Sequence, residues 1–361
     1  MAMKLMRNAV VGMRGYAPGE QPTEGGYLKL NTNENPYPPS PRVVEALAAE
    51  AGRLRLYPDP TASRLRARIA SYCGVAPEEV LVGNGSDELL TIAVRTFADA
   101  GALVATPDPT YTLYRTLCEI QGARHVAVPY RDDYSLNPDL VPAKARLVFI
   151  ANPNSPSGTL LPEETLAAVA RSISGVLVVD EAYADFARTN AAGLLKSRRN
   201  VVILRTLSKS FSLAGLRVGY ALADREIIAG FDKVKDSYNV GRLAIAGGLA
   251  AIEDAAWMRE NVRRIVATRK RLAARLAALG FTVFPSEANF VLARISSYPA
   301  RQIYEHLKKR RILVRYYDTP RLADCVRISV GTDEEIERLL EQIAEIIGWR
   351  AGEGGGRGGG R

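Results

Sequence analysis

A single lysine in the middle of the chain carries the pattern with the clearest chemical meaning. Lys209 follows the aliphatic run 201–204. Thr206 and Ser208 flank it, and Arg217 lies eight residues further along. An amine at the end of a buried strand loses its proton more easily and attacks carbonyl carbons, while hydroxyls and a guanidinium are typical ligands of a phosphate dianion. The spacing therefore indicates a carbonyl cofactor that carries a phosphate, although a lysine in a surface turn would give the same local pattern.

Two further polar groups follow aliphatic runs in the same way. Asp180 comes directly after the run 176–179, and Asn152 follows the run 147–151. In open parallel sheets, functional side chains gather where the strands end at their carboxyl termini. A carboxylate at the end of a buried strand needs a cationic or N–H partner, and a protonated ring nitrogen would supply one. A helix N-cap would also explain Asp180. Asn152 and Tyr183 are suited to donate to an oxygen on such a ring.

A glycine-bearing turn offers a second anchor for a phosphate. Gly85, Ser86 and Asp87 follow a short aliphatic run and open a helix, whose free backbone N–H groups are suited to an anion. We expect Asp87 to contribute its backbone N–H, because its carboxylate would repel the phosphate. Tyr111 begins another helix, where its ring can either stack on a flat cofactor or join the core. Together these residues predict pyridoxal 5′-phosphate bound covalently to Lys209.

From residue 41 onward, aliphatic runs alternate with helical patterns, which is typical of a mainly parallel sheet with helices on both faces. The expected strands are 79–82, 102–106, 124–128, 146–151, 175–180, 201–205 and 218–222. The expected helices are 41–52, 62–73, 87–99, 110–121, 162–173, 225–235, 242–254 and 258–279. The sequence therefore predicts an α/β fold, with a mainly parallel seven-stranded sheet in a large cofactor-binding domain over residues 41–275.

The pattern changes near residue 280 to that of a smaller α+β domain, which we assign to residues 276–350. Its expected strands are 281–284, 289–294, 313–316 and 326–330, and its expected helices are 299–311 and 333–348. Residues 1–40 are rich in Pro, Gly and Asn and are predicted to form a mostly irregular N-terminal arm that joins the small domain. The Gly/Arg-rich residues 351–361 are predicted to be disordered.

Composition excludes several other classes of protein. The chain has 361 residues, of which 47% are hydrophobic, as is ordinary for a globular protein. We expect no membrane span and no secretory signal, and three widely spaced cysteines favour the cytoplasm. The net charge of +9 comes from clusters without interleaved aromatic residues, so no nucleic acid is expected as a partner. His125 and His306 have no partner at a ligand spacing, so no metal is expected.

The order of the candidate residues resembles that of fold-type I pyridoxal-phosphate aminotransferases. The similarity runs through Asn152, the segment 180–183, the pair Ser208–Lys209 and the segment 215–217. Further segments resemble the histidinol-phosphate aminotransferases within that family, namely 14–19, 30–37, 56–59, 85–88, 312–315 and 326–331. The resemblance covers roughly residues 14–348.

The resemblance implies roles for five more residues. The residue that matches Tyr57 reaches the cofactor phosphate of the neighbouring subunit, which implies a homodimer. The residues that match Tyr16 and Arg315 contact the phosphate of the substrate, and the one that matches Arg327 binds the α-carboxylate of the amino-acid partner. Asn33 matches a residue close to the substrate. A guanidinium that faces a cleft is well shaped for a carboxylate, although an arginine on a strand also often faces solvent.

The same resemblance implies a transaminase that moves the amino group of L-histidinol phosphate to 2-oxoglutarate in histidine biosynthesis. The products would be imidazole-acetol phosphate and glutamate. We expect Lys209, Asp180 and Tyr183 to be catalytic in a ping-pong cycle. Three alternatives stay open: an aromatic amino-acid aminotransferase, a phosphothreonine-type pyridoxal-phosphate decarboxylase on the same scaffold, and a regulator that keeps the fold as a sensor.

Overall fold

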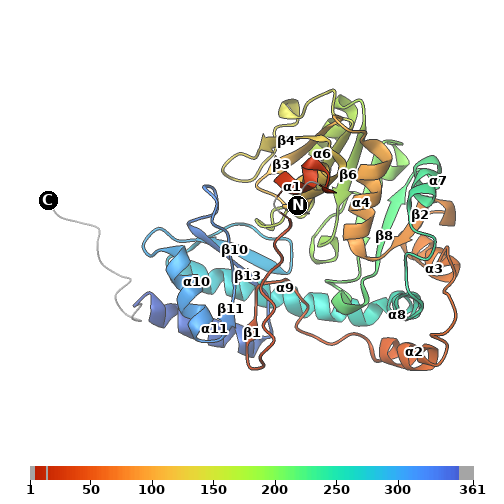
Figure 1. Cartoon of the computed structure of the whole chain (residues 1–361). Coiled ribbons are helices and arrows are strands. Elements are labelled where there is room, and N and C mark those ends of the chain that lie inside the picture. The colour runs from red at the N-terminus through yellow and green to blue at the C-terminus, as the bar shows by residue number, and fades with distance from the viewer. Residues whose placement is uncertain (1–4, 14, 349–361) are drawn as a thin grey trace.

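The computed structural model describes residues 5–13 and 15–348, which form two lobes joined by the long helix α9 (Ala255–Ala278) (Figure 1). The larger lobe contains a seven-stranded sheet, and the smaller lobe contains a four-stranded sheet. The segment 351–361, for which the sequence predicts disorder, lies outside the described residues. No helix among the residues described is long and apolar enough to cross a membrane.

The large sheet has the strand order β2-β8-β7-β6-β5-β3-β4. Its strands are β2 (Val80–Gly83), β3 (Leu103–Asp108), β4 (Arg124–Pro129), β5 (Leu147–Ala151), β6 (Val176–Asp180), β7 (Val201–Thr206) and β8 (Gly219–Ala223). All neighbours are parallel except β8, which runs antiparallel to both β2 and β7. Every residue of β5 is buried, as expected for a strand covered on both faces. The predicted mainly parallel seven-stranded sheet is confirmed.

Helices cover both faces of this sheet. They are α2 (Pro41–Ala51), α3 (Ser63–Cys73), α4 (Gly85–Phe97), α5 (Leu113–Gln121), α6 (Glu163–Ser172), α7 (Arg225–Val234) and α8 (Arg242–Glu253). Successive side chains of a strand point to opposite faces, so Phe149 packs with residues of α4, α5 and α7, whereas Ile150 packs with residues of α3, α6 and α8. The strand ends at Ala151, Asp180 and Thr206 therefore reach one edge of a rigid, two-sided core.

The small lobe combines both ends of the described chain. Its elements are β1 (Leu28–Lys29), β9 (Thr282–Val283), β10 (Phe290–Arg294), β11 (Ile312–Leu313), β12 (Arg315–Tyr316), β13 (Cys325–Ser329), α10 (Ala300–Lys309) and α11 (Asp333–Ile346). The four-stranded antiparallel sheet has the order β12-β13-β10-β9, and β1 pairs in parallel with β11. The short helix α1 (Asn8–Gly12) of the N-terminal arm packs instead against α5 of the large lobe (Figure 1).

Two features of the small lobe differ from or refine the sequence-based expectation. The single strand expected at 313–316 is split at Val314, because β11 pairs with β1 while β12 pairs with β13. Helix α9 contributes Met258 to the core of the large lobe and Ile265 and Leu272 to the core of the small lobe. The helix thus anchors one lobe to the other, and the domain limits at residues 40, 275 and 350 stay predictions.

Candidate active site

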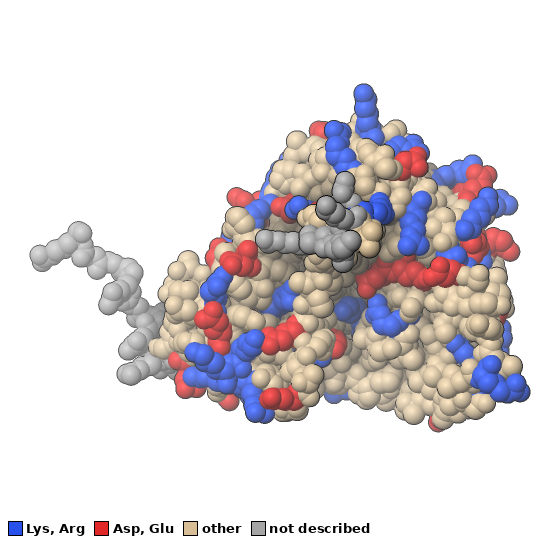
Figure 2. Space-filling view, viewed as in Figure 1, with Lys and Arg blue, Asp and Glu red and all other residues tan. Residues whose placement is uncertain are grey.

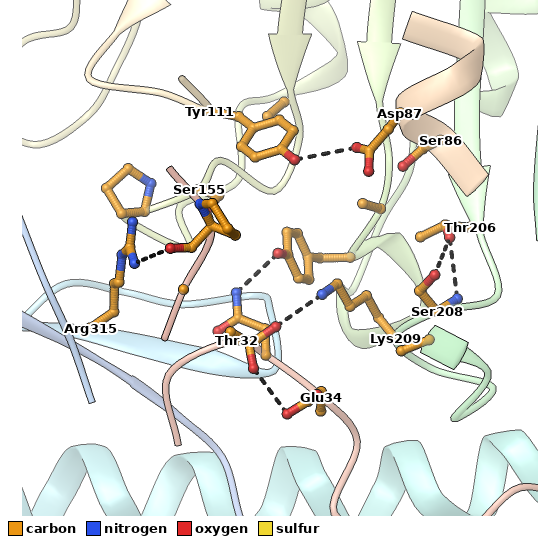
Figure 3. Close-up of a pocket in the computed structure, with 18 of the residues that line it drawn as sticks. Thr32, Glu34, Ser86, Asp87, Tyr111, Ser155, Thr206, Ser208, Lys209 and Arg315 are labelled. Carbon is orange, nitrogen blue, oxygen red and sulfur yellow. Dashed lines mark hydrogen bonds between the residues drawn. The ribbon is translucent and has the colours of Figure 1, made fainter. Parts of the chain in front are cut away.

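A cavity of about 600 Å³ opens where the strands of the large sheet end, and both lobes contribute to its walls (Figure 3). The structure brings most of the predicted site residues to this cavity. Those that line it are Tyr16, Asn33, Ser86, Asp87, Tyr111, Asp180, Tyr183, Thr206, Ser208, Lys209, Arg217, Arg315 and Arg327. Residues separated by more than 300 positions in the chain therefore share one pocket.

The amine of Lys209 lies inside this cavity. It follows β7 and its Nζ donates a hydrogen bond to the carbonyl oxygen of Thr32, at 3.1 Å (Figure 3). Loss of water around the amine, together with the nearby positive charge of Arg327, lowers the pKa of Lys209 to about 8. A sizeable fraction of the amine is therefore neutral near physiological pH, which is the form that attacks a carbonyl carbon.

Asp180 ends β6 and presents a buried carboxylate to the same cavity. Its Oδ2 accepts a hydrogen bond from the hydroxyl of Tyr114 at 2.8 Å, and its Oδ1 accepts one from the backbone N–H of Ala182 at 3.1 Å. Burial raises the pKa of Asp180 to about 6, and the two donors oppose that rise. The group is therefore charged above about pH 6 and can pair with a cation that enters the pocket.

The predicted phosphate ligands form one connected cluster. Arg217 donates through Nη1 to Ser208 Oγ and through Nη2 to the carboxylate of Asp87, both at 3.1 Å. The hydroxyl of Thr206 lies 2.9 Å from Ser208 Oγ (Figure 3). Gly85 has a φ of +79°, and a Cβ at this position would lie 2.5 Å from Arg217 Nη2. The turn therefore requires glycine both for its backbone conformation and for the approach of the guanidinium.

The side chain of Asp87 also faces the cavity, whereas we expected only its backbone N–H to do so. The hydroxyl of Tyr111 donates to Asp87 Oδ1 at 3.2 Å (Figure 3). Arg217 pairs with Oδ2 of the same carboxylate. The positive charge of Arg217 compensates the carboxylate, which explains why it is tolerated among groups suited to an anion.

Two arginines from the small lobe lie side by side at the other end of the cavity. Arg315 on β12 and Arg327 on β13 are register partners, so their side chains lie on the same face of the small sheet. Arg327 is only 7% exposed and donates to Asn31 O at 2.8 Å and to Ser155 Oγ at 3.2 Å. Its Nε has no partner, and no described carboxylate pairs with either arginine. Like charges in register repel, so this pair is suited to binding anions.

Two predicted substrate residues complete this end of the pocket. The ring of Tyr16 meets that of Tyr111 edge-on, with the centroids 5.6 Å apart. Asn33 donates through Nδ2 to the hydroxyl oxygen of Tyr183 at 3.0 Å, and its Oδ1 accepts from Ser329 Oγ at 2.8 Å. Because Asn33 already donates to Tyr183, the hydroxyl proton of Tyr183 is free to be donated into the cavity.

Asn152 and Tyr57 do not line the cavity. Both polar atoms of the Asn152 side chain bond the backbone of Leu161, at 2.7 and 3.3 Å. The amide nitrogen has a second hydrogen, so the predicted donation from Asn152 to a ring oxygen stays a prediction. Tyr57 is 78% exposed and stacks on Tyr238, with the ring centroids 4.6 Å apart. It is not brought to the cavity of its own chain.

Several residues that line the cavity were missed by sequence reasoning. They include Thr32, Glu34, Tyr114, Ser155 and Tyr317. Tyr114 follows Tyr111 by three positions near the start of α5, and that helical spacing is the one signal that could have identified it. The other four lie in irregular segments, where spacing carries little information.

The fold and the site together define the class of this protein. A mainly parallel sheet, a small α+β lobe, and a half-buried lysine and a buried carboxylate in the cavity between them are the features of a fold-type I enzyme. Residues 26–343 match the family described as aminotransferase class I and II, and the chain belongs to this family.

Individual relatives cover nearly the whole chain. A histidinol-phosphate aminotransferase from Rippkaea orientalis is 45% identical over 343 residues, which are 95% of this chain and 99% of that protein. A protein of the same name from Rhodopirellula baltica is 46% identical over 345 residues, covering 94% and 95% of the two chains. The crystal structure of histidinol-phosphate aminotransferase from Sinorhizobium meliloti, in complex with pyridoxal-5′-phosphate, superimposes with a TM-score of 0.84 at 32% identity and covers 89% and 90%.

Proposed function

We propose that the protein is a pyridoxal 5′-phosphate-dependent transaminase that acts on L-histidinol phosphate and 2-oxoglutarate in histidine biosynthesis. The observation that carries this proposal is the joint placement, in one cavity, of a partly neutral lysine, a buried carboxylate and two arginines without a carboxylate partner. The relatives named above carry the same activity in their names, and the related crystal structure contains the cofactor.

The residues present fit the cofactor. Lys209 would bind its aldehyde, Asp180 would face its ring nitrogen, and Tyr111 would lie against its ring. Its phosphate would be held by Ser86, the backbone of Gly85 and Asp87, Ser208 and Arg217. At position 85 this group of residues accommodates only glycine. When bound, this cofactor supplies an electron sink that stabilises negative charge on the substrate carbon.

The residues of the chain supply the proton transfers. The Nζ of Lys209 would take the proton from the substrate carbon, and a pKa of about 8 suits a group that must both accept and donate a proton near neutral pH. The carboxylate of Asp180 would balance the positive charge of a protonated ring nitrogen. Because Asn33 donates to the hydroxyl oxygen of Tyr183, the hydroxyl proton of Tyr183 would be available to a ring oxygen.

The two arginines explain how one site accepts both substrates. Arg315 and Tyr16 would hold the phosphate of histidinol phosphate, and Arg327 would hold the α-carboxylate of glutamate or 2-oxoglutarate. A guanidinium binds either group through paired, charge-assisted hydrogen bonds. The second arginine favours a phosphorylated substrate over a simple aromatic amino acid, which needs only one such group.

We also propose that the protein works as a homodimer, in which Tyr57 reaches the cofactor phosphate of the partner's site. Its high exposure and its position outside the cavity of its own chain support a role toward a second copy. The three cysteines of the chain are all free thiols, which fits a reducing compartment such as the cytoplasm.

One assay tests the substrate assignment. Purified protein with pyridoxal phosphate and 2-oxoglutarate is given L-histidinol phosphate, phenylalanine or tyrosine, and glutamate formation is measured. We expect the highest kcat/KM for histidinol phosphate. A higher value for phenylalanine or tyrosine would instead favour an aromatic aminotransferase, and release of carbon dioxide without glutamate would favour the decarboxylase.

A further inference from the structure

The hydroxyl of Tyr114 is the one side-chain donor to Asp180 among the described residues. The donation to Oδ2 measures 2.8 Å and both groups are buried. Asp180 receives its other hydrogen bond from the backbone N–H of Ala182, which a side-chain substitution other than proline leaves in place. Tyr114 is therefore the residue through which the chain can adjust this carboxylate.

Packing fixes the position of the Tyr114 hydroxyl. The ring is fully buried and stacks on Phe149 of β5, with the centroids 5.0 Å apart and the planes within 8° of parallel. It also meets the ring of Tyr111 edge-on, with the centroids 5.5 Å apart. A fully buried ring in a close-packed core has little room to move, which keeps the hydroxyl directed at Asp180.

The charges around Asp180 make this donor necessary. Burial disfavours the carboxylate, and the negative charges of Asp87 on α4 and Glu181 at the end of β6 add to that cost. Tyr183 also interacts electrostatically with Asp180, and the cationic side chains of Lys209 and Arg217 line the same pocket. Burial and the carboxylate keep the pKa of Tyr114 well above its usual value, so the hydroxyl remains a donor throughout the working pH range.

We propose that Tyr114 is a positioning residue for the transamination: its hydroxyl orients Asp180 and keeps it negatively charged, ready to pair with a protonated ring nitrogen. This inference rests on the proposed function, because it assigns Tyr114 a role in holding the cofactor of that reaction. Tyr114 acts through Asp180 and touches neither the substrate nor the reacting atoms.

The test compares Tyr114→Phe with Tyr130→Phe. The first variant keeps the stacked ring and removes only the hydroxyl. The second removes a buried hydroxyl that has no hydrogen-bond partner, from a residue outside the cavity, and so serves as a matched control. Circular dichroism verifies that both variants are folded.

The first readout needs no cofactor. The carboxyl stretching band of Asp180, identified by infrared difference against Asp180→Asn, is titrated in the full-length protein without cofactor. Because a hydrogen bond to a charged group favours the charged form, we expect the midpoint in Tyr114→Phe to rise by about one to two pH units above that of the wild type. Tyr130→Phe should titrate like the wild type. Equal midpoints in all three proteins, or equal shifts in both variants, would overturn the proposal.

The second readout is the dissociation constant of pyridoxal phosphate between pH 6 and 9. We expect affinity to fall as the pH drops through the midpoint of Asp180, and this fall to begin at a higher pH in Tyr114→Phe, weakening binding at pH 7 by about twofold to tenfold. If the dissociation constant of Tyr114→Phe depends on pH as that of the wild type does, the role of Tyr114 is refuted, while the proposed function is unaffected. A wild-type protein that does not bind the cofactor would refute the proposed function, while the infrared titration would still decide whether Tyr114 keeps Asp180 charged.

Discussion

Lys209 is reactive because the protein shields its amine from water. The same amine in an exposed position stays protonated at neutral pH and attacks carbonyls slowly. With its amine shielded from water just beyond the end of β7, and with Arg327 nearby, Lys209 has a pKa of about 8. The neutral fraction therefore increases as the pH rises toward 8 and changes little above about pH 9.

Replacing this residue tests its role directly. In Lys209→Ala we expect the absorbance of bound pyridoxal phosphate to revert to that of the free aldehyde, and turnover to fall at least about a hundredfold, because both the covalent link and the base are lost. Lys233→Ala, which changes an exposed lysine on α7, should behave like the wild type. A Lys209→Ala protein with the wild-type spectrum would show that another group binds the cofactor.

Arg315 provides a second prediction at the scale of the residue. It donates to the carbonyl oxygens of Ala17 and Pro18, both at 3.2 Å, so it is held in place before any substrate arrives. We expect Arg315→Ala to lower kcat/KM for histidinol phosphate by about tenfold or more, since a charge-assisted contact to phosphate is lost. The value for phenylalanine should change much less. Equal losses for both substrates would reject the assignment of Arg315 to the phosphate.

The residues found from sequence were those with a local signal. Asp180 directly follows one aliphatic run and Lys209 lies shortly after another, and such a run marks the carboxyl end of a strand. Tyr114 was missed because its acceptor lies 66 residues away, and nothing near it in the chain reports that contact. Likewise, nothing in the sequence around Asn152 indicates that its amide bonds the backbone of Leu161, nine residues further on.

At the scale of elements, a buried ion pair links the ends of two central strands. Arg205 on β7 pairs with Glu181, directly after β6, at 2.8 Å, and the Glu181 side chain is fully buried. Glu181 also accepts the backbone N–H of Ala191 and so fastens the loop that follows β6. The pair lies beside Asp180 and holds the strand ends that carry the site.

Breaking this pair should destabilise the fold. Arg205→Met leaves the Glu181 carboxylate buried without a partner, and we expect the free energy of unfolding in urea to fall by about 3 kcal/mol. Adding Glu181→Gln to that variant should restore part of the loss. The matched control is Arg199→Met, which breaks the exposed pair with Asp224 and should leave stability nearly unchanged. Similar losses in Arg205→Met and Arg199→Met would contradict the importance of burial.

The elements themselves were largely predictable, since each strand of the large sheet is a short aliphatic run. Their directions were less so, because an apolar run such as β8 reads the same whether it pairs parallel or antiparallel. The splitting of β11 from β12 depends on β1, which lies almost 300 residues earlier. No pattern local to residues 312–316 contains that information.

At the scale of the whole molecule, the exposed aromatic residues raise the question of assembly. Tyr57 and Tyr238 stack on each other at the surface, and Leu54 and Leu56 beside them are also exposed. The wider surface has no single basic region on the face shown in Figure 2, where lysines and arginines are dispersed among acidic residues. An apolar patch of this kind fits a second copy of the chain better than a nucleic acid.

Mixed dimers test whether Tyr57 acts across the interface. Tyr57→Ala and Lys209→Ala should each be weakly active or inactive alone. In a dimer with one subunit of each, one site receives Lys209 from the first subunit and Tyr57 from the second, so we expect mixing by co-expression to restore part of the activity. No recovery in mixed dimers whose composition has been verified by mass would show that Tyr57 acts within its own chain, or not at all.

The pairing of β1 with β11 has a consequence for the order in which the protein is made. Leu28 and Leu30 bond to Arg311 and Leu313, so this early strand must wait while a ribosome adds nearly 300 more residues, at about 5–20 per second. The residues proposed to hold the cofactor, which end at Arg217, leave the ribosome long before Arg315 and Arg327, which are proposed to bind the substrate. A chain released after the large lobe would keep the residues proposed to hold the cofactor. Its strand β1 would lack its partner β11, and an unpaired strand edge tends to pair with other chains.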